Sequence, residues 1–370
     1  MRPAFSSTGQ AGAFALLLLV SLLLPVMMGS SLMSAREQVY ASLWSANGDY
    51  QFIEQEIFHE KSDLDILFIG SSHIACGIDT PYVEEQLSRR QGHPAKVRSF
   101  VWGGAGSDHL YFIARDLLER RKVKVLVFDG DYNPQNQPQN YAPRWFCFGD
   151  RSGNLEGLSW RLKVIFYFGA VMGMPRSIFS LLNQPLPADE ESNKRTHWAI
   201  STRTLNPMDR LGSIPSLLGF AEDPSLEHGP FSKFKPRTNV QASSARVYAP
   251  ATKANFDFSG PDLPPLQLNF FRKLGRLAQQ HDCKLVMIHV PVLDERYSDV
   301  ISTPVFWPDV LGTDVTMLGI PPAALFENLS EGDMRKLFSD PQHLNKNGME
   351  FFTSFVTPAL LDIYDDQTRH

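Results

Sequence analysis

The order of apolar segments constrains the fold of this chain more than any other feature. Three short apolar runs, at residues 65–69, 96–102 and 122–130, lack the polar alternation of a half-exposed strand, which is typical of strands buried on both faces. Two predicted helices separate these runs: 79–92, with a capping Asp79 or Thr80, Pro81 near its start and Gly92 at its end, and 110–118, with apolar residues at helical spacing. Because strand–helix–strand units connect parallel strands, this order predicts an α/β fold with a mostly parallel sheet.

The same alternation returns near the C-terminus, after an interruption. Apolar patterns predict a helix over 263–282, a buried strand over 284–292 and a last helix over 345–364. Between about 134 and 255 the rhythm breaks, because Pro, Asn and Gln crowd the start of this stretch. We therefore interpret residues 36–370 as one domain, with an insertion that either lies over the sheet or forms a lid.

An uncharged apolar stretch occupies the N-terminus. No charged residue occurs from 3 to 35, and residues 13–28 are almost wholly apolar. The hydrocarbon core of a bilayer is spanned by about 20 apolar residues, so the stretch is long enough for a membrane anchor. A cleaved signal peptide, with an apolar region of about 7 to 15 residues, is the alternative. Both interpretations export the rest of the chain, and the length favours an uncleaved single-pass anchor over residues 1–35.

Composition and charge exclude several function classes. The formal net charge is −5 and no basic stripe occurs, so nucleic acid is not an expected partner. The three cysteines, Cys76, Cys147 and Cys283, lie far apart without a CxxC pair, which predicts neither a disulfide framework nor a cysteine zinc site. We expect no metal and no cofactor.

Two serines and a histidine, Ser71, Ser72 and His73, directly follow the first predicted strand. Ligands of open α/β sheets bind outside the carboxyl ends of the strands, and a helix N-terminus offers N–H groups to a developing oxyanion. Ser72 is therefore a candidate nucleophile, although a serine pair at such a turn also serves as a helix cap. The G-x-S-x-G elbow of the α/β-hydrolases is absent, because Ile74 stands at the position of the second glycine.

A candidate acid–base pair lies just before the last predicted helix. Asp340 and His343 are three residues apart in a polar loop. This spacing brings a carboxylate close to the imidazole Nδ1–H, which would fix the tautomer and leave Nε2 as a base. A helix cap or a surface pair is the alternative for Asp-x-x-His alone. The combination with a serine at the first strand end favours catalysis.

Together, the segments GSSH, WGGAGSDH, FDGDYNP and DPQH resemble the four sequence blocks of the SGNH/GDSL hydrolase superfamily, in the family's order. In this resemblance Ser72 aligns with the nucleophile and Gly106 with the oxyanion-hole glycine. Asp340 and His343 fit the last block directly. The third block of the family is Gly-x-Asn; here one additional residue follows the glycine, and Asn133 is the nearest counterpart.

The resemblance implies a fold and a mechanism. The fold would be three-layered and flavodoxin-like, and Ser72 would attack an ester or thioester with the help of the acid–base pair. The oxyanion would be met by the N–H groups of Ser72 and Gly106 and by Asn133. Around this centre, Ser71, His73 and Asp131 would form the rim of the site.

A Gly-Ser-Ser turn, one N-terminal membrane segment and the ending DPQHLN resemble one branch of the superfamily. Its members are similar to the D-alanyl transfer protein of teichoic-acid modification and to the alginate O-acetylation proteins. This resemblance implies a bacterial inner-membrane protein with a periplasmic catalytic domain, which transfers or removes an acyl group, O-acetyl above all, on an envelope polysaccharide. The implied partners are an acyl donor, a glycan acceptor and a polytopic membrane-bound O-acyltransferase.

Two other functions fit the same sequence. The first is a plain carbohydrate or lipid esterase, because one triad serves water and sugar acceptors alike. The second is a non-catalytic glycan-binding or assembly protein that retains the fold, an alternative that the altered third block keeps open.

Other polar residues near the strand ends carry weaker expectations. Asp129 and Asp131 flank Gly130 at the end of the third predicted strand, where they either line the site or serve the turn. We expect His109 at the helix surface or the mouth of the cleft. We expect His289 to be a satisfied core histidine on a buried strand.

Overall fold

A five-stranded sheet forms the centre of the fold, and each neighbouring pair of its strands is parallel. The spatial order is β2-β1-β3-β5-β7; numbered within the sheet this is 2-1-3-4-5, the order of flavodoxin-like doubly wound folds. The predicted α/β class with a mostly parallel sheet is confirmed. The computed structural model describes residues 5–28, 36–41, 50–101, 106–130, 137–139, 142–147, 155–182 and 255–369. The strands of the sheet are β1 (Leu64–Gly70), β2 (Val97–Val101), β3 (Val123–Asp129), β5 (Lys284–Ile288) and β7 (Val315–Leu318).

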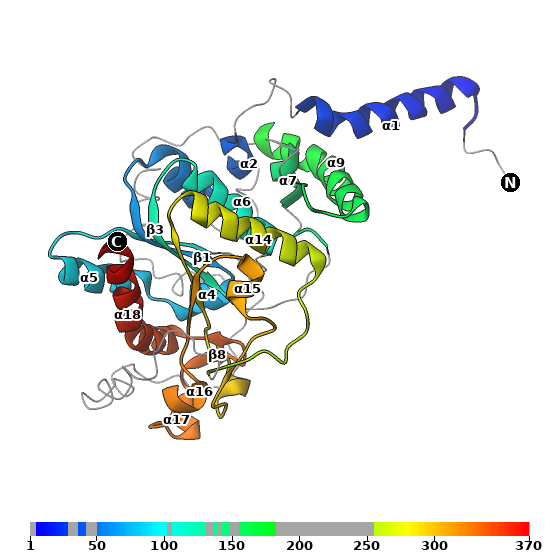
Figure 1. Cartoon of the computed structure of the whole chain (residues 1–370). Helices are drawn as coiled ribbons and strands as arrows, with labels where there is room; N and C mark the ends of the chain where they lie inside the picture. Colours follow the sequence, from blue (N-terminus) through cyan, green and yellow to red (C-terminus); the bar gives the residue numbers. More distant parts are fainter. Residues whose placement is uncertain are drawn as a thin grey trace.

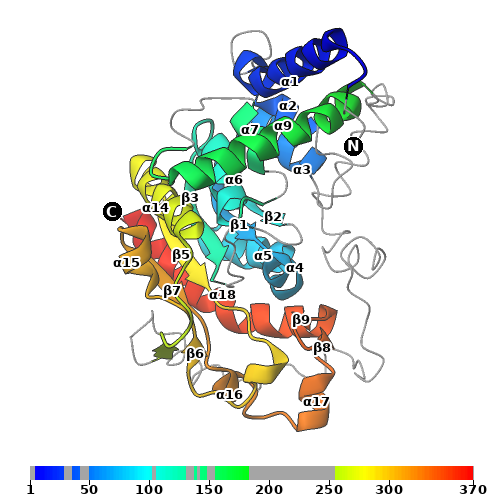
Figure 2. The ribbon, with the colours of Figure 1, turned by 90° about the vertical axis from the view of Figure 1, so that its right-hand side faces the viewer.

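Helices cover both faces of the sheet, which gives the fold three layers (Figures 1 and 2). Alternate residues of β1 point to opposite faces: Leu67 and Ile69 join one apolar core, and Ile66 and Phe68 join the other. All four are fully buried, which explains why this strand reads as a continuous apolar run. One core contains side chains of α6 (Ser107–Leu118), α14 (Pro265–Gln280) and α15 (Trp307–Leu311). The other contains side chains of α4 (Ser72–Gly77), α5 (Thr80–Gln91) and α18 (Lys346–Arg369).

The boundaries of most elements agree with local sequence signals. In α5 the Asp79 side chain accepts a hydrogen bond of 3.2 Å from the Tyr82 N–H. Gly92 follows the last turn with φ of 74°, a left-handed conformation that glycine adopts at little steric cost. The predicted strand over 284–292 is too long, because β5 ends at Ile288. Val290 and Leu293, beyond its end, are buried in the same apolar core as Ile288, so the apolar sequence pattern extends past the paired strand. The edge strand β7 was not predicted.

The described part of the predicted insertion packs against the helical layer. It contains α7 (Ala142–Cys147) and α9 (Trp160–Leu182). The rings of Trp145 and Phe166 lie 5.8 Å and 6.3 Å from that of Phe112 in α6, centroid to centroid. These two helices therefore pack against α6. Residues 183–254 lie outside the described residues, so the predicted lid is not tested there.

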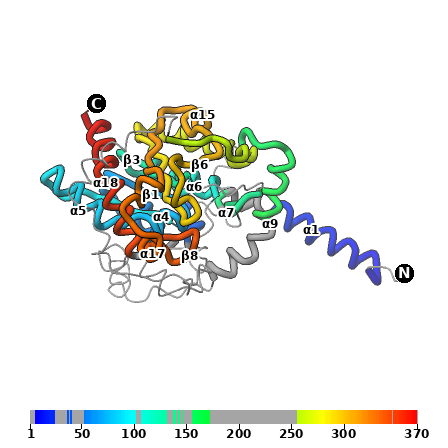
Figure 3. The backbone as a smooth tube through the Cα atoms, turned by 90° about the horizontal axis from the view of Figure 1, so that it is seen from below, coloured from blue at the N-terminus to red at the C-terminus, as the bar shows by residue number. Residues whose placement is uncertain are grey.

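The N-terminal apolar stretch forms the helix α1 (Thr8–Met28), which extends away from the α/β body beside α9 (Figure 3). The Tyr167 hydroxyl of α9 donates a hydrogen bond to the Leu22 carbonyl of α1. Within the described ranges, no helix has the length and apolarity needed to cross a membrane. The remaining short elements are α2 (Glu37–Ala41), α3 (Tyr50–Glu54), η1 (Gln55–His59), β4 (Phe256–Asp257), η4 (Leu293–Glu295), β6 (Ile301–Ser302), α16 (Pro322–Leu325), α17 (Glu331–Arg335), β8 (Phe338–Asp340) and β9 (His343–Leu344).

The contact between α14 and α15 depends on a glycine and gives a test of the packing. A Cβ atom added at Gly275 would lie 2.2 Å from the Leu311 carbonyl oxygen. We expect Gly275→Ala to lower the free energy of unfolding by about 1–3 kcal/mol, because a backbone atom cannot give way as a flexible side chain can. In the control Gly332→Ala the new Cβ has its nearest neighbour at 3.9 Å, so stability should stay level or rise slightly. Urea unfolding of both variants measures this, and equal effects would contradict the packing described.

Candidate active site

Ser72 lies at the start of a helix that begins directly after β1. Gly70 ends the strand, and Ser71 is the N-cap of α4 in an extended conformation. The Ser71 hydroxyl accepts a hydrogen bond of 3.2 Å from the His73 N–H, so part of the capping role that a serine pair suggests is real. Ser71 performs that role, which leaves the hydroxyl of Ser72, the first residue of α4, available for another partner.

The carboxylate of Asp129, at the end of β3, holds this turn in place. The Ser71 N–H donates to Asp129 Oδ2 over 2.8 Å, and the Ser71 hydroxyl donates to the same oxygen. Gly70 allows this approach, since a Cβ there would lie 2.8 Å from the Asp129 carboxyl carbon. Asp129 thus belongs to the site through Ser71, a role that the sequence analysis left undecided. Its predicted companion Asp131 lies outside the described residues.

His343 reaches Ser72 from the far end of the chain. Its Nε2 lies 3.0 Å from Ser72 Oγ, across 271 residues of sequence. Its Nδ1 lies 2.9 Å from both carboxylate oxygens of Asp340. The structure therefore brings together the three residues that the sequence analysis named as catalytic, within hydrogen-bonding distance of one another.

The pair does not lie in an irregular polar loop, as predicted, but in a small antiparallel hairpin. Asp340 of β8 pairs with His343 of β9, and the Asp340 Oδ1 atom also accepts from the backbone N–H groups of Gln342 and His343, at 2.7 Å and 3.0 Å. The carboxylate is thus fixed by the backbone before it contacts the imidazole. Two short strands leave too few apolar positions for a strand pattern, so no sequence signal predicted the hairpin.

The electrostatics of the pair favour a charged carboxylate. Burial alone would raise the pKa of Asp340, but the hydrogen bonds from the His343 ring and the Gln342 N–H outweigh burial, and its pKa lies below the ordinary value. An ionised carboxylate only accepts hydrogen bonds, so we assign the imidazole proton to Nδ1. Nε2 is then free to accept the Ser72 hydroxyl proton, as a general base requires.

The predicted oxyanion hole is described in part. Ser72 is the first residue of α4, and Gly106 is the N-cap of α6; these helices follow the neighbouring parallel strands β1 and β2. Gly70 pairs with Val101 at the carboxyl ends of these strands, so both helix N-termini open at the same edge of the sheet. Asn133, the third predicted donor, lies outside the described residues.

His73, predicted at the rim of the site, lies beside the predicted base. Its ring stacks on that of His343, with centroids 5.1 Å apart and planes inclined by 27°. Its Nδ1 is 3.4 Å from Ser71 Oγ, and the residue is buried. His73 therefore contacts the base from one side, and His343, not His73, is the imidazole hydrogen-bonded to Ser72.

A polar pocket of about 220 Å³ adjoins these residues at the carboxyl ends of β3 and β5. Its wall includes His73, Asp129, His289, Glu295 and Gln342. His289 was expected on a buried strand, and this position is wrong. The residue follows the end of β5 and lines this pocket, where its Nε2 lies 2.9 Å from Glu295 Oε2. Burial would raise the pKa of Glu295, but the contact with His289 and the Val292 N–H lower it overall. The sequence offered no sign of Glu295, which ends the short 3-10 helix η4.

Two other groups near the site are unsuited to chemistry. Burial, with a smaller contribution from the charge of Asp340, raises the pKa of the Cys76 thiol far above its ordinary value, so it forms little of the reactive thiolate. His109 is wrongly predicted at the surface; it is fully buried, with its ring 5.1 Å from that of Trp145. The helix α7, which supplies that tryptophan, covers the face on which His109 lies.

No model of a protein family matches this chain, and no curated protein matches its sequence. The site is therefore interpreted from its own geometry.

The first turn of α6 contains a buried carboxyl group that gives the stability a pH dependence. Burial raises the pKa of Asp108 from 3.8 to about 6, although the N–H groups of Gln139 and His109 donate to it. Because the folded pKa lies above the unfolded one, the unfolded chain releases its proton first, and stability falls as the pH rises from about 4 to 6. Below about pH 4 the carboxyl group is protonated in both the folded and the unfolded chain, and the destabilisation is absent.

Asp108→Asn removes this titration. We expect the variant to gain stability relative to the wild type between pH 4 and pH 7, on the order of 1–3 kcal/mol, since one unit of pKa corresponds to about 1.4 kcal/mol. Urea unfolding at the two pH values measures the gain. The exposed Asp299→Asn is the matched control; the same gain in that variant would show that Asp108 is not responsible.

Proposed function

We propose that this chain is an SGNH-type serine acyltransferase or esterase that acts on a cell-envelope polysaccharide. One observation carries the proposal: Ser72 Oγ, the His343 ring and the Asp340 carboxylate form a continuous chain of contacts of 3.0 Å and 2.9 Å. Nucleophile, base and orienting carboxylate are the three parts that serine acyl transfer needs. Their position at the carboxyl ends of β1 and β3, where the strand order of the sheet reverses, is where doubly wound folds bind ligands.

The mechanism follows from the assigned protons. Ser72 Oγ attacks the carbonyl carbon of an ester or thioester while its proton passes to His343 Nε2, and Asp340 stabilises the imidazolium that forms. The N–H groups of Ser72 and Gly106, together with Asn133, would donate to the oxyanion; each such donor is worth about 3–4 kcal/mol in comparable sites. The leaving group takes the proton from Nε2, and an acyl-serine remains.

The second half of the reaction decides between the two activities. His343 Nε2 takes a proton from an incoming hydroxyl, which attacks the acyl-serine and releases Ser72 with its proton restored. Water gives an esterase, and a sugar hydroxyl gives a transferase. The polar pocket is lined by His73, whose ring stacks on that of His343, and it offers space and hydrogen-bonding groups for an acceptor.

The envelope setting rests on the sequence. The apolar N-terminal stretch, the Gly-Ser-Ser turn and the DPQHLN ending resemble extracytoplasmic acylation proteins. We therefore propose a single-pass protein of the bacterial cytoplasmic membrane, with its catalytic domain in the periplasm. A polytopic membrane-bound O-acyltransferase would supply the acyl group, O-acetyl in the first instance, and an envelope glycan would accept it.

Serine-directed labelling tests the catalytic centre. We expect the full chain in detergent micelles to hydrolyse p-nitrophenyl acetate and to be labelled by a fluorophosphonate. Ser72→Ala should lose both, and Asp340→Asn should lower kcat by about 10³–10⁴-fold, because the imidazole loses its fixed tautomer. The matched control is Ser354→Ala, whose hydroxyl donates to the Phe351 carbonyl within α18, and it should behave as the wild type. A wild type that is neither labelled nor active, or equal labelling of Ser72→Ala, would refute the catalytic proposal and favour a binding protein.

Product analysis separates transfer from hydrolysis. With p-nitrophenyl acetate and an uronic-acid oligosaccharide together, we expect mass spectrometry to find oligosaccharide that is heavier by one acetyl group, because a sugar hydroxyl competes with water for the acyl-serine. Ser72→Ala should give none. Release of p-nitrophenol with acetate as the only acetyl product would instead identify an esterase.

A further inference from the structure

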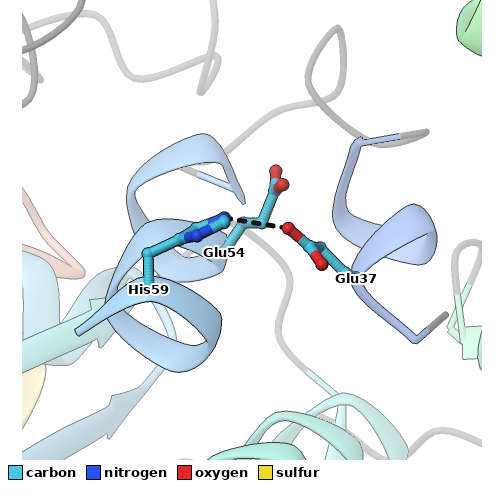
Figure 4. Close-up of side chains that lie close together, drawn as sticks. All are labelled: Glu37, Glu54 and His59. Carbon is cyan, nitrogen blue, oxygen red and sulfur yellow. Dashed lines mark ion pairs between the residues drawn. The ribbon is translucent and has the colours of Figure 1, made fainter. Parts of the chain in front are cut away.

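A second cluster of ionisable side chains lies far from Ser72. Glu37 of α2, Glu54 at the end of α3 and His59 at the end of η1 place one donor atom each within 4.8 Å of one another. The His59 Nε2 atom is 2.8 Å from Glu37 Oε1. Figure 4 shows the imidazole and both carboxylates directed at the space between these helices. The mechanism proposed above uses none of these residues.

An unusual backbone turn creates this convergence. Residues five apart in an α-helix are rotated by about 140°, so Glu54 and His59 would point apart. Here Gln55–His59 is a π-helical turn, and the Glu60 N–H donates to the Gln55 carbonyl at 3.1 Å. The wider turn brings both side chains to the side that faces Glu37. Such turns are rare and occur frequently at functional sites.

The charges and donor types of the cluster suit a divalent transition metal. Two carboxylates and a neutral imidazole carry a formal charge of −2, which one divalent cation balances. Glu54 is buried, with 8% of its surface exposed, so water competes little with an ion for its carboxylate. Mixed nitrogen and oxygen donors favour zinc over calcium or magnesium, which prefer oxygen alone.

We propose that Glu37, Glu54 and His59 bind one zinc ion, with water as the fourth ligand. Bonds of about 2.0–2.2 Å in a tetrahedral site place the donor atoms about 3.4 Å apart, so the cluster needs only small side-chain shifts. The ion would join α2 to α3 and η1. These elements precede β1, whereas Ser72 follows its carboxyl end, so the ion would act on the stability of this region and not on the reacting serine.

Zinc titration of the whole protein tests the site. Metal-stripped full chain without a histidine tag, in detergent micelles, is titrated with zinc chloride by calorimetry, and bound zinc is counted by mass spectrometry after dialysis. We expect one zinc per chain and a rise of several degrees in Tm, because the ion binds the folded state. Glu54→Gln and His59→Gln should each bind zinc at least tenfold more weakly and lose most of the rise in Tm.

The matched control removes a carboxylate elsewhere. Glu85→Gln loses one acidic group that pairs with Arg89 on α5, at 2.8 Å, and it should bind zinc as the wild type does. Glu37→Gln tests the site without changing a buried residue, and circular dichroism confirms that each variant is folded. Absence of zinc binding in the wild type, or unchanged binding in the folded cluster variants, would overturn the proposal and leave Glu37 and His59 as an ordinary ion pair. Neither result depends on the activity of Ser72.

Discussion

The hydrogen bond between Ser72 Oγ and His343 Nε2 is the interaction on which the proposed chemistry depends, and it needs the whole fold to form. Its partners are 271 residues apart, one after the first strand and the other in the last hairpin. β1 must sit between β2 and β3 to direct α4, and α18 must pack on the same face to hold the hairpin. A hydrogen bond tolerates errors of only a few tenths of an ångström, so the two apolar cores act as the support of the site.

A series of hydrogen bonds from the end of β3 positions Ser72 relative to the sheet. Asp129 ends β3 and holds both donor groups of Ser71, and Ser71 caps the helix that Ser72 begins. The Asp129 carboxylate at the end of one strand and Ser71 after the neighbouring strand thus hold the turn from which Ser72 begins α4.

The sequence predicted what depends on local patterns and missed what depends on tertiary contacts. Buried strands, the caps of α5 and the triad of Ser72, Asp340 and His343 each have a signal of periodicity, capping or spacing. The edge strand β7 was missed because four residues hold too little pattern, and β5 was overestimated because buried residues follow its end. His109 was misplaced because helix α7 covers it. Glu37, Glu54 and His59 share no motif, since a π-helical turn and a second helix bring them together.

The carboxyl ends of the strands and the segment before β1 are surrounded by different polar groups, because all strands of a parallel sheet run in the same direction. At the carboxyl ends, helices begin and present N–H groups, which suits a developing oxyanion at Ser72. Before β1, the chain is held instead by buried charge: Glu56 pairs with Arg98 and Arg121, at 2.9 Å and 3.2 Å. Cys76 and Cys283 are free and buried, so they add no covalent link to this support. A metal ion at Glu37, Glu54 and His59 would strengthen the region where ion pairs are the existing support, without placing a second cation near the serine.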